Sequence, residues 1–556
     1  MSKPIIYQAF VRHFAKKRGK NIPNGTIEEN FCGKFNNFNA KALKSVRDLG
    51  ATHIWLTGII EHATQTVWED MKLAPTADSS DIVKGIAGSP YAIRDYYDLD
   101  ADLAENVENR MQEFENLVER AHRAGLKVII DFVPNHLART YHSDIKSELN
   151  FGVKDNQNVQ FSPQNNFYYF PSQEFSPQFE LKNYREFPAK ATGNDCFSPS
   201  PSKNDWYETV KLNYGVDYQD NRREYFDPLP DTWLKMRDIL LFWAEKRIDG
   251  FRCDMAEMVS VNFWNWAISK VKNCFPNIIF IAEIYNPAQY RNYLDFGKFD
   301  FLYDKVGLYD TLRGVICGYF PAKKITECWQ NLNDIQEKML NFLENHDEQR
   351  IASVFFAKNA NAAKPALLVS VCLNASAAMI YAGQELGERG MDCEGFSGID
   401  GRTTIFDYWQ PDTLSRWIDS GNFTLKNLSQ EEKSLRDFYR KVLNLCNSHK
   451  AISCGQMFDL MYENIENQHF NSEKCYAFLR KYENEVLLIA ANFSAEKQTL
   501  KIKIPQHAFD FLKILQKENA EFWDLLSNNK FSTSFCENKF FEVEIEGFSG
   551  GIFEIK

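Results

Sequence analysis

Short apolar runs alternate with amphipathic stretches through most of this chain. Eight of the runs have the length of short buried strands. They occupy residues 4–10, 52–57, 126–131, 249–253, 277–281, 299–303, 339–343 and 377–381. Helical spacing appears between them, at residues 106–125, 232–246 and 263–273, and Gly50 ends an earlier helix. The alternation predicts an α/β fold, a parallel (β/α)8 TIM barrel with functional side chains at the carboxyl ends of its strands.

Two stretches break this alternation. After the third predicted strand come roughly a hundred residues rich in Asn, Ser, Pro and aromatic side chains, too many for a structureless loop inside a compact domain. We interpret residues 137–212 as a small inserted domain. Beyond residue 450, strands follow one another without long helices, at 475–480, 485–491, 499–504 and 540–545. The sequence therefore predicts a barrel from residues 1–136 and 213–450, and a C-terminal antiparallel β-sandwich domain from 451–556.

Several predicted barrel strands end in polar segments that carry carboxylates. Two carboxylic groups and a third charge are the groups needed to break a glycosidic bond. Arg252 lies two residues before Asp254, so both side chains point to the same side of the strand and the arginine can keep the carboxylate ionised. Glu283 follows an apolar run, where burial would raise its pKa as a general acid requires. The segments are Asp131-Phe-Val-Pro-Asn-His136, Gly250-Phe-Arg-Cys-Asp254, Ile281-Ala-Glu283 and Glu344-Asn-His-Asp347.

In this order the four segments resemble the signature regions of the α-amylase superfamily of glycoside hydrolases. The resemblance implies that Asp254 is the nucleophile, Glu283 the general acid and base, and Asp347 the group that stabilises the oxocarbenium-like transition state. It also implies that His136 and His346 bond hydroxyl groups of the bound sugar. The superfamily carries an insert after the third strand and ends in a β domain, so the resemblance extends over nearly the whole chain.

Three further segments strengthen this resemblance. Ser89-Pro-Tyr-Ala-Ile-Arg-Asp-Tyr96 resembles the segment in which a tyrosine stacks under the sugar being cleaved. Val210-Lys-Leu-Asn213 resembles the fifth conserved segment, and Tyr381-Ala-Gly-Gln-Glu385 resembles the end of the eighth strand. The expected substrate-binding residues are therefore Tyr91, His136, Arg252 and His346.

Two departures from the family pattern concern calcium. Many starch-hydrolysing α-amylases follow the nucleophile with Ala-x-Lys-His, whereas this chain has Met255-Ala-Glu-Met258. Lys211 stands where calcium-binding members place an aspartate. Calcium takes about six to eight oxygen ligands, and only Asn135 is a weak candidate here. We therefore expect no required cofactor, while a calcium ion is not excluded by the sequence.

Charge and cysteine usage narrow the expected partners and compartment. A net charge of −11 argues against binding to nucleic acid or to an anionic membrane surface. The 12 cysteines form no CxxC pair, which argues against a zinc site and favours a reduced, cytoplasmic protein. No leader-like segment precedes the first strand, and no apolar run reaches the roughly 18 residues of a membrane span. The oligomeric state is not readable.

The expected activity is retaining hydrolysis of α-1,4-linked glucans, such as starch or maltooligosaccharides, through a covalent glycosyl-enzyme intermediate. A transglycosylase of the branching or glucanotransferase type is the alternative, because the intermediate is shared and only the acceptor differs. A non-catalytic binding relative would be expected to have lost carboxylates, whereas Asp254, Glu283 and Asp347 are all present. Bond specificity, chain length and endo or exo attack stay open.

Overall fold

The barrel predicted from the sequence is confirmed. A computed structural model describes residues 3–68, 77–390, 393 and 395–556 of the chain. The barrel strands are β1 (Ile5–Phe10), β2 (His53–Thr57), β5 (Lys127–Phe132), β12 (Gly250–Cys253), β13 (Ile279–Ala282), β14 (Phe301–Tyr303), β15 (Met339–Phe342) and β16 (Ala377–Tyr381). They pair in parallel and close in the order β1-β16-β15-β14-β13-β12-β5-β2. Bulky side chains such as Trp55, Tyr303 and Phe342 fill the interior, so the barrel is a packed core and not a channel.

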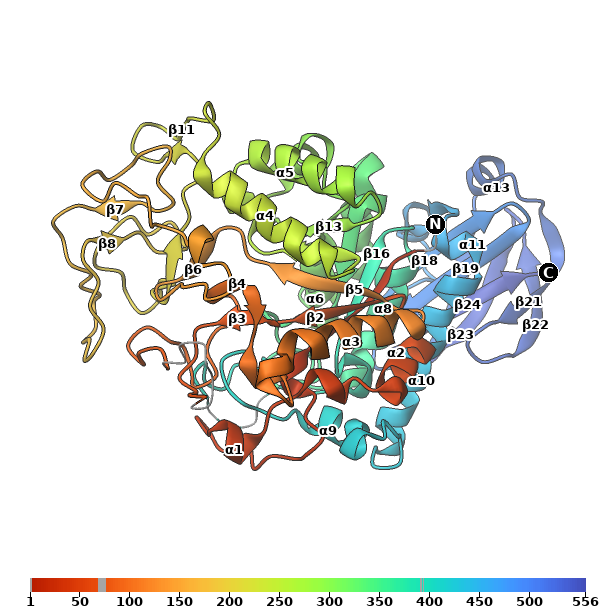
Figure 1. The fold of residues 1–556 in the computed structure, drawn as a ribbon. Coiled ribbons are helices and arrows are strands. Elements are labelled where there is room, and N and C mark those ends of the chain that lie inside the picture. The colour runs from red at the N-terminus through yellow and green to blue at the C-terminus, as the bar shows by residue number, and fades with distance from the viewer. Residues whose placement is uncertain (1–2, 69–76, 391–392, 394) are drawn as a thin grey trace.

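Helices cover the outside of the barrel (Figure 1). Gly50, with φ +114°, ends the first long helix because a residue without a Cβ adopts this left-handed conformation without strain. The helix expected at residues 106–125 is shorter, because a 3-10 turn over Val107–Asn109 precedes it. No helix in the described part of the chain has the length and apolarity to cross a bilayer. The main covering helices are α2 (Ala40–Leu49), α3 (Arg110–Arg123), α4 (Asp231–Glu245), α5 (Val261–Cys274), α6 (Asp310–Ile316), α7 (Ile325–Leu332) and α8 (Ala363–Cys372).

The long connection between β5 and α4 folds over one end of the barrel. Its strand β6 (His136–Ala138) pairs antiparallel with β9 (Thr209–Lys211), which sets His136 opposite Lys211. A second hairpin joins β7 (Tyr169–Phe170) and β8 (Ala189–Lys190). A small apolar cluster in this segment includes Tyr168, Phe170 and Phe175, and Ile82 from an earlier part of the chain packs into the same cluster. The bounds 137–212 stay a prediction.

The C-terminal region is antiparallel, as predicted. Six strands pair in the order β17-β18-β19-β24-β21-β22, and β20 pairs separately with β23. Gly550 lets this sheet approach α8 closely, since a Cβ at that position would lie 2.3 Å from a methyl carbon of Leu368. In Figure 1 this region (blue) and the insert (yellow) lie on opposite sides of the barrel. The strands are β17 (Gln456–Asp459), β18 (Cys475–Tyr482), β19 (Glu485–Asn492), β20 (Gln498–Lys503), β21 (Lys517–Asp524), β22 (Lys530–Phe535), β23 (Phe540–Ile545) and β24 (Ser549–Ile555).

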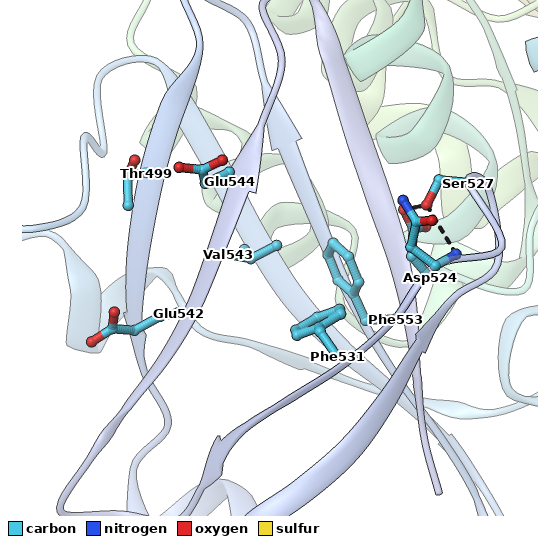
Figure 2. A pocket seen from close by; sticks show the side chains of 9 residues that line it. Thr499, Asp524, Ser527, Phe531, Glu542, Val543, Glu544 and Phe553 are labelled. Carbon is cyan, nitrogen blue, oxygen red and sulfur yellow. Dashed lines mark hydrogen bonds between the residues drawn. The ribbon is translucent and has the colours of Figure 1, made fainter.

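A cleft of about 430 Å³ opens between the strands of the C-terminal region. Figure 2 shows Phe531 and Phe553 at its centre, with Asp524 on one side and Glu542 and Glu544 on the other. We call this hollow, lined by these residues and by Thr499, Ser527, Asn529 and Val543, the C-terminal cleft.

Candidate active site

One arginine joins two carboxylates at the carboxyl end of the barrel. Arg252 Nη1 lies 2.6 Å from Asp254 Oδ1, and Arg252 Nη2 lies 2.7 Å from Glu283 Oε2. All three side chains are buried, and Arg252 has no exposed surface. Two nitrogens of a single planar guanidinium contact the two groups, so this cation holds both carboxylates at one point of the site.

The local backbone directs Glu283 toward Asp254. Strands β12 and β13 pair with Cys253 opposite Ala282, so the residues that follow them emerge side by side. Met255 has φ +42°, a left-handed conformation that is unfavourable for a residue with a side chain. This turn aims the Met255 amide, which donates a 2.9 Å hydrogen bond to Glu283 Oε2. The strain therefore lies at a position that orients a carboxylate of the site.

The third carboxylate, Asp347, lies beside a stacked pair of rings. Tyr91 and His346 stack with centroids 5.2 Å apart and an interplanar angle of 22°. The Tyr91 hydroxyl lies 2.5 Å from His346 Nε2, and the same nitrogen lies 3.1 Å from Asp347 Oδ2. On the other side of the imidazole, Gln8 Nε2 lies 2.8 Å from His346 Nδ1. The histidine is thus held on both nitrogens and in turn positions Tyr91 and Asp347.

Asp131 connects this ring pair to the central cation. Its Oδ2 accepts hydrogen bonds of 3.2 Å from Trp55 Nε1 and from the Gly58 amide. Its Oδ1 lies 3.4 Å from the Tyr91 hydroxyl and 3.7 Å from Arg252 Nη1. Burial raises the pKa of Asp131 to about 7, although the Arg252 charge opposes the shift. Asp131 therefore links the barrel strand β2 and the residue after it to Tyr91 and Arg252.

Burial and crowding shift the titration of the carboxylates. Burial raises the pKa of Glu283; Arg252 opposes this shift, and the charge of Asp254 adds to it. Burial, followed by the charge of Glu283, also raises the pKa of Asp347. For Arg252, burial alone would lower the pKa, but Glu283 and other neighbours more than offset it and the pKa is raised. The arginine stays charged among groups that compete for protons, a pattern that is typical of active sites.

The junction between barrel and insert is held by a lysine. Lys211 Nζ donates to Asn135 Oδ1, lies 2.7 Å from Asp195 Oδ1 and donates to the Met258 carbonyl at 3.3 Å. Its side chain is buried. Within the described ranges, no group of three or more His, Cys, Asp or Glu side chains could hold a metal ion. The oxygen of Asn135, the weak metal candidate, therefore faces an ammonium group.

The site opens into a pocket of about 240 Å³. Of the predicted residues, Tyr91, His136, Asp254, Glu283 and Asp347 line it, while Arg252 and His346 lie behind them with almost no exposed surface. Burial, together with the charges of Lys211 and Lys84, lowers the pKa of His136 to about 3 and keeps its ring neutral. Nine further lining residues were not among the predicted site residues: Lys84, Ser89, Trp206, Glu208, Thr209, Met255, Tyr285, Ile405 and Phe406.

Tyr285 is the missed residue that contacts the predicted machinery directly. Its hydroxyl donates a 2.5 Å hydrogen bond to Glu283 Oε1. Glu257 fixes the backbone there, because its carboxylate accepts from the Tyr285 amide at 3.2 Å and the Asn286 amide at 3.1 Å. Tyr285 follows Glu283 by two positions, and this spacing is the signal that could have identified it.

The carboxylates cluster at the carboxyl ends of neighbouring strands of a parallel barrel, which is where barrel enzymes carry their active sites. The alpha amylase catalytic-domain family matches residues 8–455, and the alpha amylase C-terminal all-beta domain family matches residues 465–556. The chain therefore belongs to the alpha-amylase family, whose members act as glycoside hydrolases or transglycosylases.

Individual relatives are distant. Alpha-amylase 2 of Dictyoglomus thermophilum is 23% identical over 541 residues, which cover 95% of this chain and 73% of that protein. An alpha-1,4-glucan:maltose-1-phosphate maltosyltransferase of Cereibacter sphaeroides is 26% identical over 249 residues, covering 44% of this chain and 28% of that protein. The crystal structure of a noncanonic maltogenic alpha-amylase, AmyB from Thermotoga neapolitana, has a TM-score of 0.63 at 21% identity and covers 99% of this chain and 98% of its own. At this identity the structural likeness establishes the fold.

Proposed function

We propose that this enzyme is a retaining hydrolase of α-1,4-linked glucans or maltooligosaccharides. The observation that carries the proposal is the double contact of Arg252 with Asp254 and Glu283. Retention requires two carboxyl groups only about 5–5.5 Å apart, whereas inversion leaves about 6.5–9.5 Å for a water molecule. The contact of both carboxylates with one guanidinium brings them near each other, which supports the retaining arrangement.

In the first step, an oxygen of Asp254 forms a bond with C1 of the sugar while the bond from C1 to the glycosidic oxygen breaks. Glu283, protonated because burial raises its pKa, gives its proton to that departing oxygen. Arg252 Nη1, 2.6 Å from Asp254 Oδ1, holds this carboxylate in place. Asp347 bonds ring hydroxyls and stabilises the positive charge that develops on the ring.

In the second step, Glu283 takes a proton from water, the water oxygen attacks C1, and the bond to Asp254 breaks. The configuration at C1 is inverted twice and is therefore retained. Tyr91 is the platform under the reacting sugar, and His136 is a partner of its hydroxyl groups. His346, predicted to be a second partner, is buried and engaged at both ring nitrogens, so we assign it to positioning Tyr91 and Asp347. A sugar hydroxyl that attacked in place of water would give transglycosylation. The similarity to a maltosyltransferase supports transglycosylation as the second candidate activity.

The calcium requirement, the charge of the substrate and the cellular compartment are the remaining parts of the proposal. No calcium ion is needed, because Lys211 supplies positive charge to the oxygens of Asn135, Asp195 and Met258. The net charge of −11 supports a neutral glucan substrate and not a nucleic acid or an anionic membrane. We place the enzyme in the cytoplasm because its 12 cysteines are free thiols.

Proton NMR of early products tests the stereochemistry. Release of the α-anomer first is expected, and release of the β-anomer first would contradict the role of Asp254. A product profile on soluble starch, maltooligosaccharides and sucrose separates hydrolysis from transfer. Products longer than the substrate would favour the transglycosylase, and only shorter products would favour the hydrolase.

A further inference from the structure

Two charged residues that the proposed mechanism does not use line the catalytic pocket. Lys84 comes from the connection between β3 (Ile60–His62) and β4 (Ile93–Leu99), and Glu208 directly precedes β9 of the insert. Lys84 Nζ lies 2.8 Å from Glu208 Oε1, with side-chain exposures of 13% and 5%. The second oxygen, Glu208 Oε2, is buried and has no hydrogen-bond partner among the described residues. A buried carboxylate oxygen without a donor is rare, and at a pocket wall it suggests that a ligand supplies the donor.

Both residues sit on a backbone that is fixed. In the connection that carries Lys84, Arg12 donates to the Ala87 carbonyl at 3.2 Å, and the Ala87 amide donates to the Phe406 carbonyl at 3.1 Å. The Glu208 carbonyl accepts from the Arg139 amide at 3.1 Å. The ammonium and the carboxylate are thus held in place before any ligand arrives, which favours binding.

Their position relative to the reacting centre assigns them to one side of the scissile bond. Glu283 protonates the leaving group, so Tyr285, which bonds Glu283, marks the leaving-group side. Lys84 shares its connecting segment with Tyr91, the platform of the sugar that becomes attached to the enzyme. His136 lines the same pocket, and its strand β6 pairs with β9, which Glu208 directly precedes. Since Lys84 and Tyr91 share one segment, we assign Lys84 and Glu208 to the side of the glycone, the sugar that the enzyme retains.

We propose that Glu208 and Lys84 form a subsite that binds hydroxyl groups of the glycone and makes both of them specificity-determining residues. A sugar hydroxyl both donates and accepts, so it can donate to Glu208 Oε2 and accept from the Lys84 ammonium. The pair has no net charge, which suits a neutral sugar and disfavours an acidic one. This inference rests on the proposed glycosidase function, because it assumes that Tyr91 carries the glycone.

Fluoride release from α-D-glucosyl fluoride tests the subsite, because this substrate has a glycone and no sugar as leaving group. The 3-, 4- and 6-deoxy analogues each remove one hydroxyl group. We compare kcat/KM for the wild type, Glu208→Gln and Lys84→Met, variants that keep the size of each side chain. The matched control is Lys190→Met, since Lys190 lies 3.4 Å from a different buried glutamate of the insert, Glu186, and does not line this pocket.

The effect of each side-chain change and the effect of removing the bound hydroxyl group are not expected to add. On the parent fluoride, Glu208→Gln and Lys84→Met should each lower kcat/KM by about ten- to a hundredfold, as expected for losing a hydrogen bond to a charged group. On the analogue that lacks the bound hydroxyl, the variants should lose little further activity. Lys190→Met should match the wild type on every substrate.

An equal loss on all four fluorides, accompanied by a lower melting temperature, would overturn the proposal and mean that the ion pair only joins the loop to the insert. Variants as active as the wild type would also overturn it. A wild type that neither releases fluoride nor cleaves maltooligosaccharides would instead contradict the proposed function. The two failures are therefore distinguishable.

Discussion

The catalytic pocket and the C-terminal cleft both contain carboxylates on strands, but the environments of these groups are opposite. In the pocket, Asp254 and Glu283 are buried and share Arg252. In the cleft, Glu542 lies 3.1 Å from its own partner, Lys501, with 52% of the glutamate side chain exposed. Glu544 lies 2.6 Å from Lys497 and is 62% exposed, and Asp524 accepts 2.5 Å and 3.0 Å hydrogen bonds from Ser527 and Leu526 within a turn.

The difference shows that the size of a hollow does not identify an active site. The cleft is the larger of the two, at about 430 Å³ against about 240 Å³. What distinguishes the pocket is that burial and neighbouring charges raise the pKa values of Glu283 and Asp347 beside one buried cation, Arg252. In the cleft, Glu542 and Glu544 each pair with an exposed lysine, and such pairs contribute little, while a turn holds Asp524.

The largest effect is expected from Asp254→Asn, which removes the proposed nucleophile and leaves the shape of the side chain. Turnover on maltooligosaccharides should fall by several orders of magnitude, because no covalent intermediate can form. The melting temperature should change little. Asp524→Asn, the matched change in the C-terminal cleft, should keep wild-type turnover. Near-normal activity of a folded Asp254→Asn protein would remove the basis of the mechanism.

Glu283→Gln should lose less activity than Asp254→Asn, and the size of the loss should depend on the leaving group of the substrate. General acid catalysis contributes about 10²- to 10⁴-fold, so turnover of maltooligosaccharides should fall by that order. Glycosyl fluorides need no proton on the leaving group, and their first step should be nearly spared. Azide should partly restore the second step by capturing the intermediate. Equal losses on both substrate types would assign Glu283 another role, and Glu542→Gln is the control at the cleft.

These two predictions rest on residues that the sequence alone could identify. Asp254, Glu283 and Asp347 were proposed because their segments, each following a short apolar run, together resemble the signature regions of the α-amylase superfamily. The barrel itself was predictable because eight short apolar runs alternate with amphipathic stretches. Lys84 and Glu208 were not, because they lie in irregular segments far apart in the chain and meet only through tertiary packing.

A lysine at the barrel–insert junction should matter more for stability than a lysine at the cleft. Lys211→Met leaves the oxygens of Asn135 and Met258 without their buried donor, so the free energy of unfolding should fall by about 1–3 kcal/mol. Lys501→Met removes only an exposed pair and should change it by about 0–1 kcal/mol. Urea unfolding of both variants gives the comparison.

The same junction carries the calcium prediction. In the wild type, excess chelator should leave melting temperature and activity unchanged, because the Lys211 ammonium already neutralises the oxygen cluster. A sharp drop in melting temperature with chelator that calcium alone reverses would place an ion between barrel and insert and would contradict this expectation.

Tyr285→Phe is expected to have a smaller effect than the changes above, namely a shift in the pH dependence of activity. The Tyr285 hydroxyl bonds the ionised form of Glu283 and so opposes the rise in pKa that burial causes. Its removal should raise the pKa of Glu283 further. Since the general acid acts when protonated, the alkaline limb of the kcat/KM profile should move to higher pH. The control is Tyr462→Phe, an exposed tyrosine of the C-terminal region. An unchanged limb, or a shift to lower pH, would contradict the role of this hydrogen bond.

The smallest effect is expected from changing the cleft itself. Glu542→Gln combined with Glu544→Gln removes two exposed charges whose lysine partners remain free to bind water. Each pair contributes about 0–1 kcal/mol, so the melting temperature should stay close to that of the wild type. Activity on short maltooligosaccharides and on soluble starch should both be unchanged, because the cleft lies on the C-terminal strands and not at the carboxyl end of the barrel.

The informative measurement is the ratio of the two activities. A selective loss on starch, with maltooligosaccharides unaffected, would show that the cleft holds part of a long glucan, and the contrast between a reactive pocket and an inert cleft would then be wrong.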